Sequence, residues 1–181
     1  RLYKNQKYLQ SISFEYVKKI IVESEIEVQN LACMIGLMEG NLLESDLKII
    51  CNNYSVKEGL FRTKLFQFQN GNIQIRHMFY LGPLQQMAFL SSYRQHEIYT
   101  MLFDKIELLS VDIFCKTIKK IQLAIFLENR QYLEETWKEV ISNLLRQEDY
   151  VLAQSLLKEV YSLMENDFSA SELFDTFLMS S

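Results

Sequence analysis

Residues 137–157 have the sequence WKEVISNLLRQEDYVLAQSLL, and this stretch sets the expected fold. Apolar residues recur at helical spacing on both sides of a polar turn, Glu148-Asp149-Tyr150. The first apolar stripe consists of Trp137, which is the only tryptophan of the chain, Val140, Ile141 and Leu144. In the second stripe the small residue Ala153 precedes Leu157, so that two neighbouring helices can approach closely. The stretch therefore predicts a helical hairpin, with helices over 131–147 and 150–165.

The spacing follows the helix-turn-helix repeat called TPR, which reads W-x2-L-G-x2-Y and then A-x3-F. Trp137 and Ala153 occupy the tryptophan and alanine positions, whereas Ile141 replaces the glycine and no proline closes the unit. Helices with short connections are also expected at about 84–94, 97–109 and 111–128, although the repeat period of about 34 residues does not link them. We therefore expect an all-α fold, a TPR-like right-handed solenoid of stacked antiparallel helix pairs.

The helical pattern also extends through residues 1–82, where several helix-start signals occur. Ser55-Val56-Lys57-Glu58 has the form of a capping box, as does Ser169-Ala170-Ser171-Glu172, and Ser110 is an expected N-cap. The helix after the first box should run through Phe66 and Phe68 to a stop at Asn70-Gly71-Asn72. Residues 73–80 alternate for a few positions, but a lone strand would lack a partner, so we interpret them as helical.

The composition agrees with one all-α domain over 1–181, comprising N-terminal helices in 1–82 and TPR-like pairs in 83–181. Five glycines and one proline are few for a sheet-rich chain of 181 residues. The net charge of −4 gives no basic footprint for nucleic acid. No apolar run approaches the ~18 residues that a membrane span requires, so we expect no membrane association.

Three cysteines, Cys33, Cys51 and Cys115, lie far apart in apolar helical patterns. Their odd number and spacing predict buried reduced thiols in a cytoplasmic protein, with a catalytic or intersubunit cysteine as the alternative. His77 and His96 lack a ligand partner at i+3 or i+4, and no phosphate-binding loop or nucleophile motif is present. We therefore expect no enzyme activity, no metal and no cofactor.

The polar face of the helix at 131–147 is the expected peptide-binding surface, because the first helix of a TPR-type pair lines the concave side. The residues predicted to bind a peptide are Lys138, Glu139, Ser142, Asn143 and Arg146. The Asn143 amide can bond both N–H and C=O of an extended peptide, and Arg146 can bind a carboxylate. The alternative is a solvated outer face with i,i+4 pairs such as Glu134–Lys138.

Two stretches carry a family resemblance. In 95–109 the shared positions are Leu102, Phe103 and the later leucines, and the second stretch runs from Asn143 through Ala153 and Leu157 to 160–164. On these residues, 84–166 resemble the C-terminal regulatory domain of Rgg-type transcriptional regulators, the peptide-pheromone receptors of Gram-positive bacteria that include the MutR and GadR branches. The Trp, both glycines and the Glu of the family's first motif are absent.

The resemblance implies a peptide-sensing domain that forms a homodimer through its C-terminal helices. It also implies a short hydrophobic peptide in the concave groove, held by Asn143, and DNA binding only through a helix-turn-helix domain upstream of Arg1. Two other functions stay open from the sequence. One is a helical-repeat scaffold that holds a larger protein without switching, and the other is an enzyme built on an all-α bundle.

Overall fold

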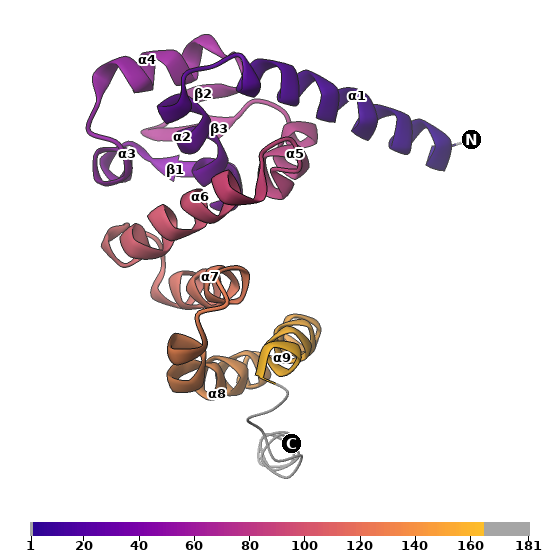
Figure 1. Ribbon diagram of the computed structural model, residues 1–181, viewed down its shortest axis with the longest axis vertical. Helices are drawn as coiled ribbons and strands as arrows, with labels where there is room; N and C mark the ends of the chain where they lie inside the picture. The colour runs from indigo at the N-terminus through magenta and orange to yellow at the C-terminus, as the bar shows by residue number, and fades with distance from the viewer. Residues whose placement is uncertain (1, 165–181) are drawn as a thin grey trace. The chain divides into compact units, whose positions relative to one another are not determined.

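The computed structural model describes residues 2–164 and shows a mostly helical protein, as expected (Figure 1). The chain divides into two compact units, unit 1 with residues 1–110 and unit 2 with residues 111–181. The stacked solenoid and its handedness stay predictions.

Unit 1 is built around one central helix, α2. The elements of unit 1 are α1 (Leu2–Val22), α2 (Ile26–Leu37), β1 (Asn41–Leu43), α3 (Glu44–Ile50), α4 (Tyr54–Arg62), β2 (Phe66–Gln69), β3 (Asn72–Ile75), the 3-10 helix η1 (Met78–Tyr80), α5 (Leu81–Gln86), α6 (Ser92–Lys105) and the 3-10 helix η2 (Ile106–Leu108). From Leu31 to Leu37 every residue of α2 is buried, because α1, α4, α5 and α6 all contact this helix. A helix that is apolar on all sides belongs in a core of this kind.

A three-stranded antiparallel sheet in unit 1 corrects two sequence expectations. The strand order is β1-β3-β2, so that Ile73 of the central strand faces Leu42 on one side and Phe68 on the other. Residues 73–75 are therefore not helical, and the helix from residue 55 does not reach Phe68. The strand β3 is stable here because it has two partners, one of which comes from more than 25 residues upstream.

The order α3, α4 and β-hairpin has the topology of a winged helix-turn-helix. Only residues 51–53 separate α3 from α4, which is the short connection of such a helix pair. The hairpin turn is Asn70-Gly71, with φ of 53° and 78°, as a type I′ turn requires. The resemblance implied a helix-turn-helix domain upstream of Arg1, whereas this helix pair lies within the chain.

The helix caps differ from those expected. The Asn53 side chain accepts a hydrogen bond from the Ser55 N–H at 3.1 Å, so the N-cap of α4 is Asn53 and not Ser55. The helix expected at 111–128 is capped by Asp112 and not by Ser110. The Ser110 N–H is instead bonded at 3.0 Å by the carboxylate of Asp46, a fully buried residue of α3. The box at 169–172 lies outside the described residues.

The break between the two helices that follow residue 80 lies at residues 87–91, earlier than the break expected between 94 and 97. The helix α5 ends at Gln86, Met87 has a left-handed φ of 47°, and α6 begins at Ser92 with Ser91 as its N-cap. The helices expected at 84–94 and 97–109 are therefore misplaced. The left-handed Met87 stops α5 because a residue in that conformation cannot continue a right-handed helix.

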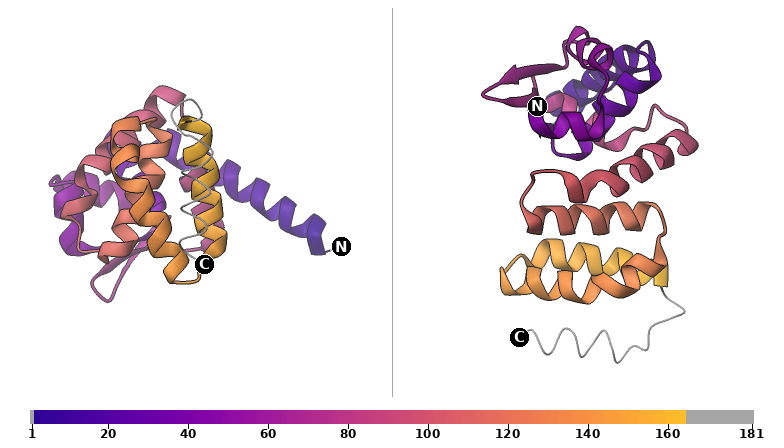
Figure 2. Two further views of the ribbon diagram at one scale, coloured as in Figure 1. Left: turned by 90° about the horizontal axis from the view of Figure 1, so that it is seen from below. Right: turned by 90° about the vertical axis from the view of Figure 1, so that its left-hand side faces the viewer.

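Unit 2 consists of α7 (Ile113–Phe126), α8 (Arg130–Arg146) and α9 (Tyr150–Met164), close to the expected ranges. The central helix α8 contacts both neighbours, and Figure 2 shows the three successive helices running back and forth. Both connections are three residues long and have the same construction. Glu128 and Glu148 adopt a left-handed conformation, and the amide of the next residue bonds back to Ala124 or Leu144. This pattern is the Schellman motif, which ends a helix abruptly.

Candidate functional site

The core-facing side of α8 agrees with the sequence prediction. Trp137, Val140, Ile141 and Leu144 are all buried, with Trp137 only 1% exposed. Asparagine and aspartate side chains cap the starts of α8 and α9. The Asn129 side chain accepts a hydrogen bond from the Tyr132 N–H, and the Asp149 side chain accepts one from the Leu152 N–H. Ala153 of α9 is also buried, so a small side chain lies where α9 packs beside α8.

The five predicted peptide-binding residues lie on the outer side of α8 and do not converge on one point. Lys138, Glu139 and Arg146 are exposed, and Ser142 and Asn143 are half-buried. At 100° per residue, Asn143 lies about 140° around the helix from Lys138. Within the set, Arg146 Nη1 donates a hydrogen bond to Asn143 Oδ1 at 3.5 Å. The Lys138 ammonium lies 5.6 Å from the centre of the Trp137 ring. Their role in peptide binding stays a prediction.

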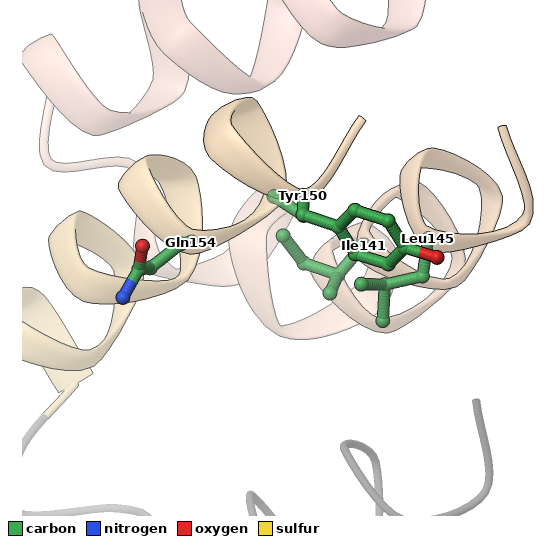
Figure 3. Close-up of a pocket in the computed structure, with 5 residues that line it drawn as sticks. Ile141, Leu145, Tyr150 and Gln154 are labelled. Atoms are coloured by element: carbon green, nitrogen blue, oxygen red, sulfur yellow. The ribbon is translucent and has the colours of Figure 1, made fainter. Parts of the chain in front are cut away.

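An apolar pocket of about 240 Å³ lies between α8 and α9, beside this predicted surface. It is lined by Ile141, Leu145, Tyr150, Ala153 and Gln154. Figure 3 shows the Tyr150 ring lying over Ile141 and Leu145, with Gln154 further along α9. None of the five predicted residues lines the pocket. Sequence reasoning placed Ile141 and Ala153 in the helix contact and overlooked Leu145, Tyr150 and Gln154.

The pocket can bind an apolar side chain and offers polar groups only at its edge. Ile141, Leu145 and Ala153 are at most 8% exposed, whereas Tyr150 is 60% exposed. The Tyr150 phenol and the Gln154 amide are the side-chain groups there that can form hydrogen bonds. These two groups can orient a bound molecule, while Ile141, Leu145 and Ala153 provide apolar contact area.

No family model, curated protein or solved structure matches this chain. The interpretation of the pocket therefore rests on its own geometry.

The helix-turn-helix pair of unit 1 has no surplus of positive charge. Residues 26–76 carry equal numbers of negative and positive side chains. The acidic residues are Glu27, Glu39, Glu44, Asp46 and Glu58, and the basic residues are Lys48, Lys57, Arg62, Lys64 and Arg76. On α4, Lys57 pairs with Glu44 and Arg62 pairs with Glu58. Affinity for nucleic acid depends on cations that neutralise phosphates. The topology alone therefore does not make this helix pair a nucleic-acid site.

The cysteines and histidines do not form a reactive centre in the part of the chain that the structure describes. Burial raises the pKa of the Cys33 thiol to about 12, with a smaller opposing effect of Arg94, so Cys33 stays protonated. Cys115 is exposed, contrary to the expectation of a buried thiol, and Cys51 is half-buried. Over residues 2–164, no three His, Cys, Asp or Glu side chains are arranged to hold a metal ion. None of the helices in that range is long and apolar enough to cross a membrane.

Proposed function

We propose that this chain is a regulatory interaction module that binds a short apolar peptide along the α8–α9 pair, and that it is not an enzyme. The observation that carries the proposal is the apolar pocket between Ile141, Leu145 and Ala153, open at the Tyr150 edge. Burying one leucine-sized side chain there contributes about 1.5–3 kcal/mol to binding. The rest of the affinity must come from groups around the pocket.

We propose that two of the five predicted residues contribute. Lys138 is three residues before Ile141, and Ser142 is three before Leu145, so each is the helix-surface neighbour of a residue that lines the pocket. They can bond the main chain of a peptide whose apolar residue occupies the pocket. Asn143 and Arg146 lie further around the helix, and we propose that they contact the peptide only where it wraps across the outer side of α8.

The resemblance to Rgg-type regulators suggests what such binding achieves. In that proposal the peptide stabilises one arrangement of a homodimer and so shifts the population of DNA-binding states. The acidic net charge and the balanced charges of 26–76 favour a separate DNA-binding domain for the phosphate contacts. The peptide-binding and regulator parts of the proposal are separable by experiment.

The test of peptide binding is calorimetric titration of the 181-residue chain with a pool of short apolar peptides. Saturable binding should weaken about tenfold or more in Tyr150→Ala and remain unchanged in Tyr161→Ala. Tyr161 is the matched control, because it lies on the same helix at 40% exposure outside the pocket. Lys138→Ala and Ser142→Ala should weaken binding more than Asn143→Ala and Arg146→Ala. Absence of saturable heat with every peptide, or equal binding by both tyrosine variants, would rule the proposal out.

A scaffold for a larger protein is the second candidate. Large apolar side chains are strongly exposed in both units, including Tyr54 at 73%, Ile113 at 77% and Val151 at 82%. Exposed apolar side chains of this kind are typical of protein contacts when they gather into patches. A scaffold should retain a folded partner in a pull-down and ignore short peptides, which is the opposite of the result expected for the first proposal. The native mass of the purified chain tests the expected homodimer.

A further inference from the structure

The side of α9 that borders the α8–α9 pocket is only partly covered by the other helices of unit 2. Tyr150 is 60% exposed at the pocket, and Leu157, which is half-buried, lies on the same side of α9 seven residues later. Ala153, Val160 and Met164 are at most 2% exposed, because α9 packs on α7 and α8. The apolar surface of α9 is therefore wider than the part that these two helices cover.

Residues 169–181, with the sequence SASELFDTFLMSS, have the pattern of one more amphipathic helix, and they come shortly after Met164, the last described residue. The stretch from Ser169 to Glu172 has the form of a capping box. Apolar residues recur at i, i+3, i+4, i+7 and i+8, and they are Ala170, Leu173, Phe174, Phe177 and Leu178. Glu172 and Asp175 fall on the opposite side of such a helix. The sequence thus predicts a helix with one apolar face.

A helix over 170–181 is long enough to reach the pocket. At 1.5 Å per residue it extends about 17 Å, which equals the length of α9 from Met164 back to Ala153. The connections 127–129 and 147–149 reverse the chain within unit 2 (Figure 2), and 165–168 is a connection of similar length. A helix that runs back along α9 brings Phe177 and Leu178 within about one helical turn of Gln154 in the pocket.

Two physical effects favour this occupant over a free peptide. A single helix of this length is marginal in water unless its apolar face packs against another surface. A segment tethered by a short linker also has an effective concentration on the order of 1 mM at the neighbouring surface. A free peptide at a much lower concentration therefore competes poorly for the same surface.

We propose that segment 169–181 of the chain itself occupies the α8–α9 pocket, as a helix antiparallel to α9 with Phe177 and Leu178 against Ile141 and Tyr150. This inference rests on the proposed function, in which the pocket binds a peptide, and it adds how that site is regulated. A peptide from outside enters the pocket only by displacing segment 169–181. The chain is therefore self-inhibited for peptide binding until that segment is displaced.

The first test compares amide NMR spectra of the 181-residue chain and two variants of the same length. Phe177→Asp places a charge on the apolar face of segment 169–181, whereas Met179→Asp, the matched control, places the same charge about 200° around the helix. Phe177→Asp should shift the amides of Ile141, Leu145 and Gln154, and Met179→Asp should leave them unchanged. Unchanged pocket amides in Phe177→Asp, or equal shifts in both variants, would overturn the proposal.

A synthetic peptide of residues 169–181 provides the rescue. When it is added to the Phe177→Asp chain, it should return the pocket amides saturably to their original positions, and the same peptide carrying F177D should not. Failure of this rescue counts against the proposal. Pocket shifts of the unmodified chain that change with its concentration would assign the pocket to a segment of a second copy, and would equally overturn self-occupation.

The pool of short apolar peptides separates this inference from the proposed function. These peptides should bind the Phe177→Asp chain about tenfold or more tightly than the unmodified chain, because the competing phenyl ring is removed. Equal binding to both chains would overturn self-occupation while the peptide-binding function stands. Absence of binding to both chains, with the pocket amides still shifted in Phe177→Asp, would overturn the peptide-binding function while self-occupation stands.

Discussion

Replacing Gly36 by alanine should destabilise unit 1, although the same change stabilises most helices. Gly36 lies in α2, and a Cβ added there would be 2.6 Å from Leu84 Cβ and 3.2 Å from the Leu84 carbonyl carbon. Carbon atoms in contact normally lie about 3.5–4.0 Å apart. Because Leu84 Cβ is attached to the backbone, rotation of the leucine side chain cannot relieve the overlap, and α5 as a whole has to move.

The expected size follows from two opposing contributions. Alanine in place of glycine inside a helix gains about 1 kcal/mol. Overfilling a packed core costs about 1–3 kcal/mol, and the upper part of that range applies because backbone atoms are involved. The free energy of unfolding of unit 1 should therefore fall by about 1–2 kcal/mol. The residue itself is buried, so solvation of the added methyl group does not offset the loss.

Two other glycines are matched controls. At Gly59 an added Cβ would meet Val28 Cγ2 at 2.7 Å, and a terminal methyl group can shift, so Gly59→Ala should cost less. At Gly82 nothing lies within 4 Å, and Gly82→Ala in α5 should be neutral or stabilising by up to about 1 kcal/mol. Hydrogen exchange of the α2 amides with urea reports unit 1 without interference from unit 2. The reasoning is refuted if Gly36→Ala is as stable as Gly82→Ala.

Four further predictions concern single residues. Trp137→Ala should lower the stability of unit 2 by about 3–5 kcal/mol in thermal unfolding, because it empties a site that is 1% exposed; a loss below 1 kcal/mol would show that the ring is not a core residue. Asn53→Ala should cost about 1 kcal/mol of stability in urea, whereas Ser55→Ala should cost much less; the reverse order would restore Ser55 as the cap. Glu148→Gly should raise the urea midpoint of unit 2 by relieving a left-handed φ of 62°, worth up to about 1 kcal/mol, and no gain would mean that the turn is unstrained. The pKa of Cys33 rises from about 9 to about 12 on folding, so the native state retains a proton that the unfolded chain loses, and stability should fall as pH rises from about 9 towards 12. Cys33→Ala should flatten that pH dependence, and an identical slope would contradict the assignment.

The helices of unit 2 could be predicted from sequence because their signals are local. Trp137, Leu144 and Ala153 follow an apolar period that only a helix satisfies, and Asp149 is both a turn residue and a cap. Each of these signals acts within one or two turns of chain. The predicted ends of α8 and α9 therefore lie within one residue of those observed.

The sheet of unit 1 could not be predicted in the same way because its pairing is non-local. Ile73 pairs with Leu42, which is separated from it by two helices, and β1 is only three residues long. One local signal was available. Asn70-Gly71 between alternating residues is typical of a type I′ hairpin, yet we interpreted it as the end of a helix. A partner strand supplied by β2 would have removed the objection to a lone strand at 73–75.

In the candidate site, too, the local features could be predicted from sequence and the non-local ones could not. The exposed side of α8 follows from the buried stripe, so Lys138, Glu139 and Arg146 could be placed on the surface from sequence. The pocket could not be predicted, since it depends on how far Tyr150 leans across from the start of α9 onto Leu145. Helical periodicity shows on which side of its own helix a residue lies. It carries no information on the size of the gap between two packed helices.

The two identical turns of unit 2 limit how this unit can meet a partner. Residues 127–129 and 147–149 use their backbone groups to end one helix and begin the next, and no spare length remains to form a loop that reaches outward. A ligand that binds in this region therefore contacts the helices themselves and not the loops between them. Loop insertion, the route by which many binding proteins acquire new ligands, is therefore closed at these two connections. Any change of ligand preference there has to arise one side chain at a time along α7, α8 or α9.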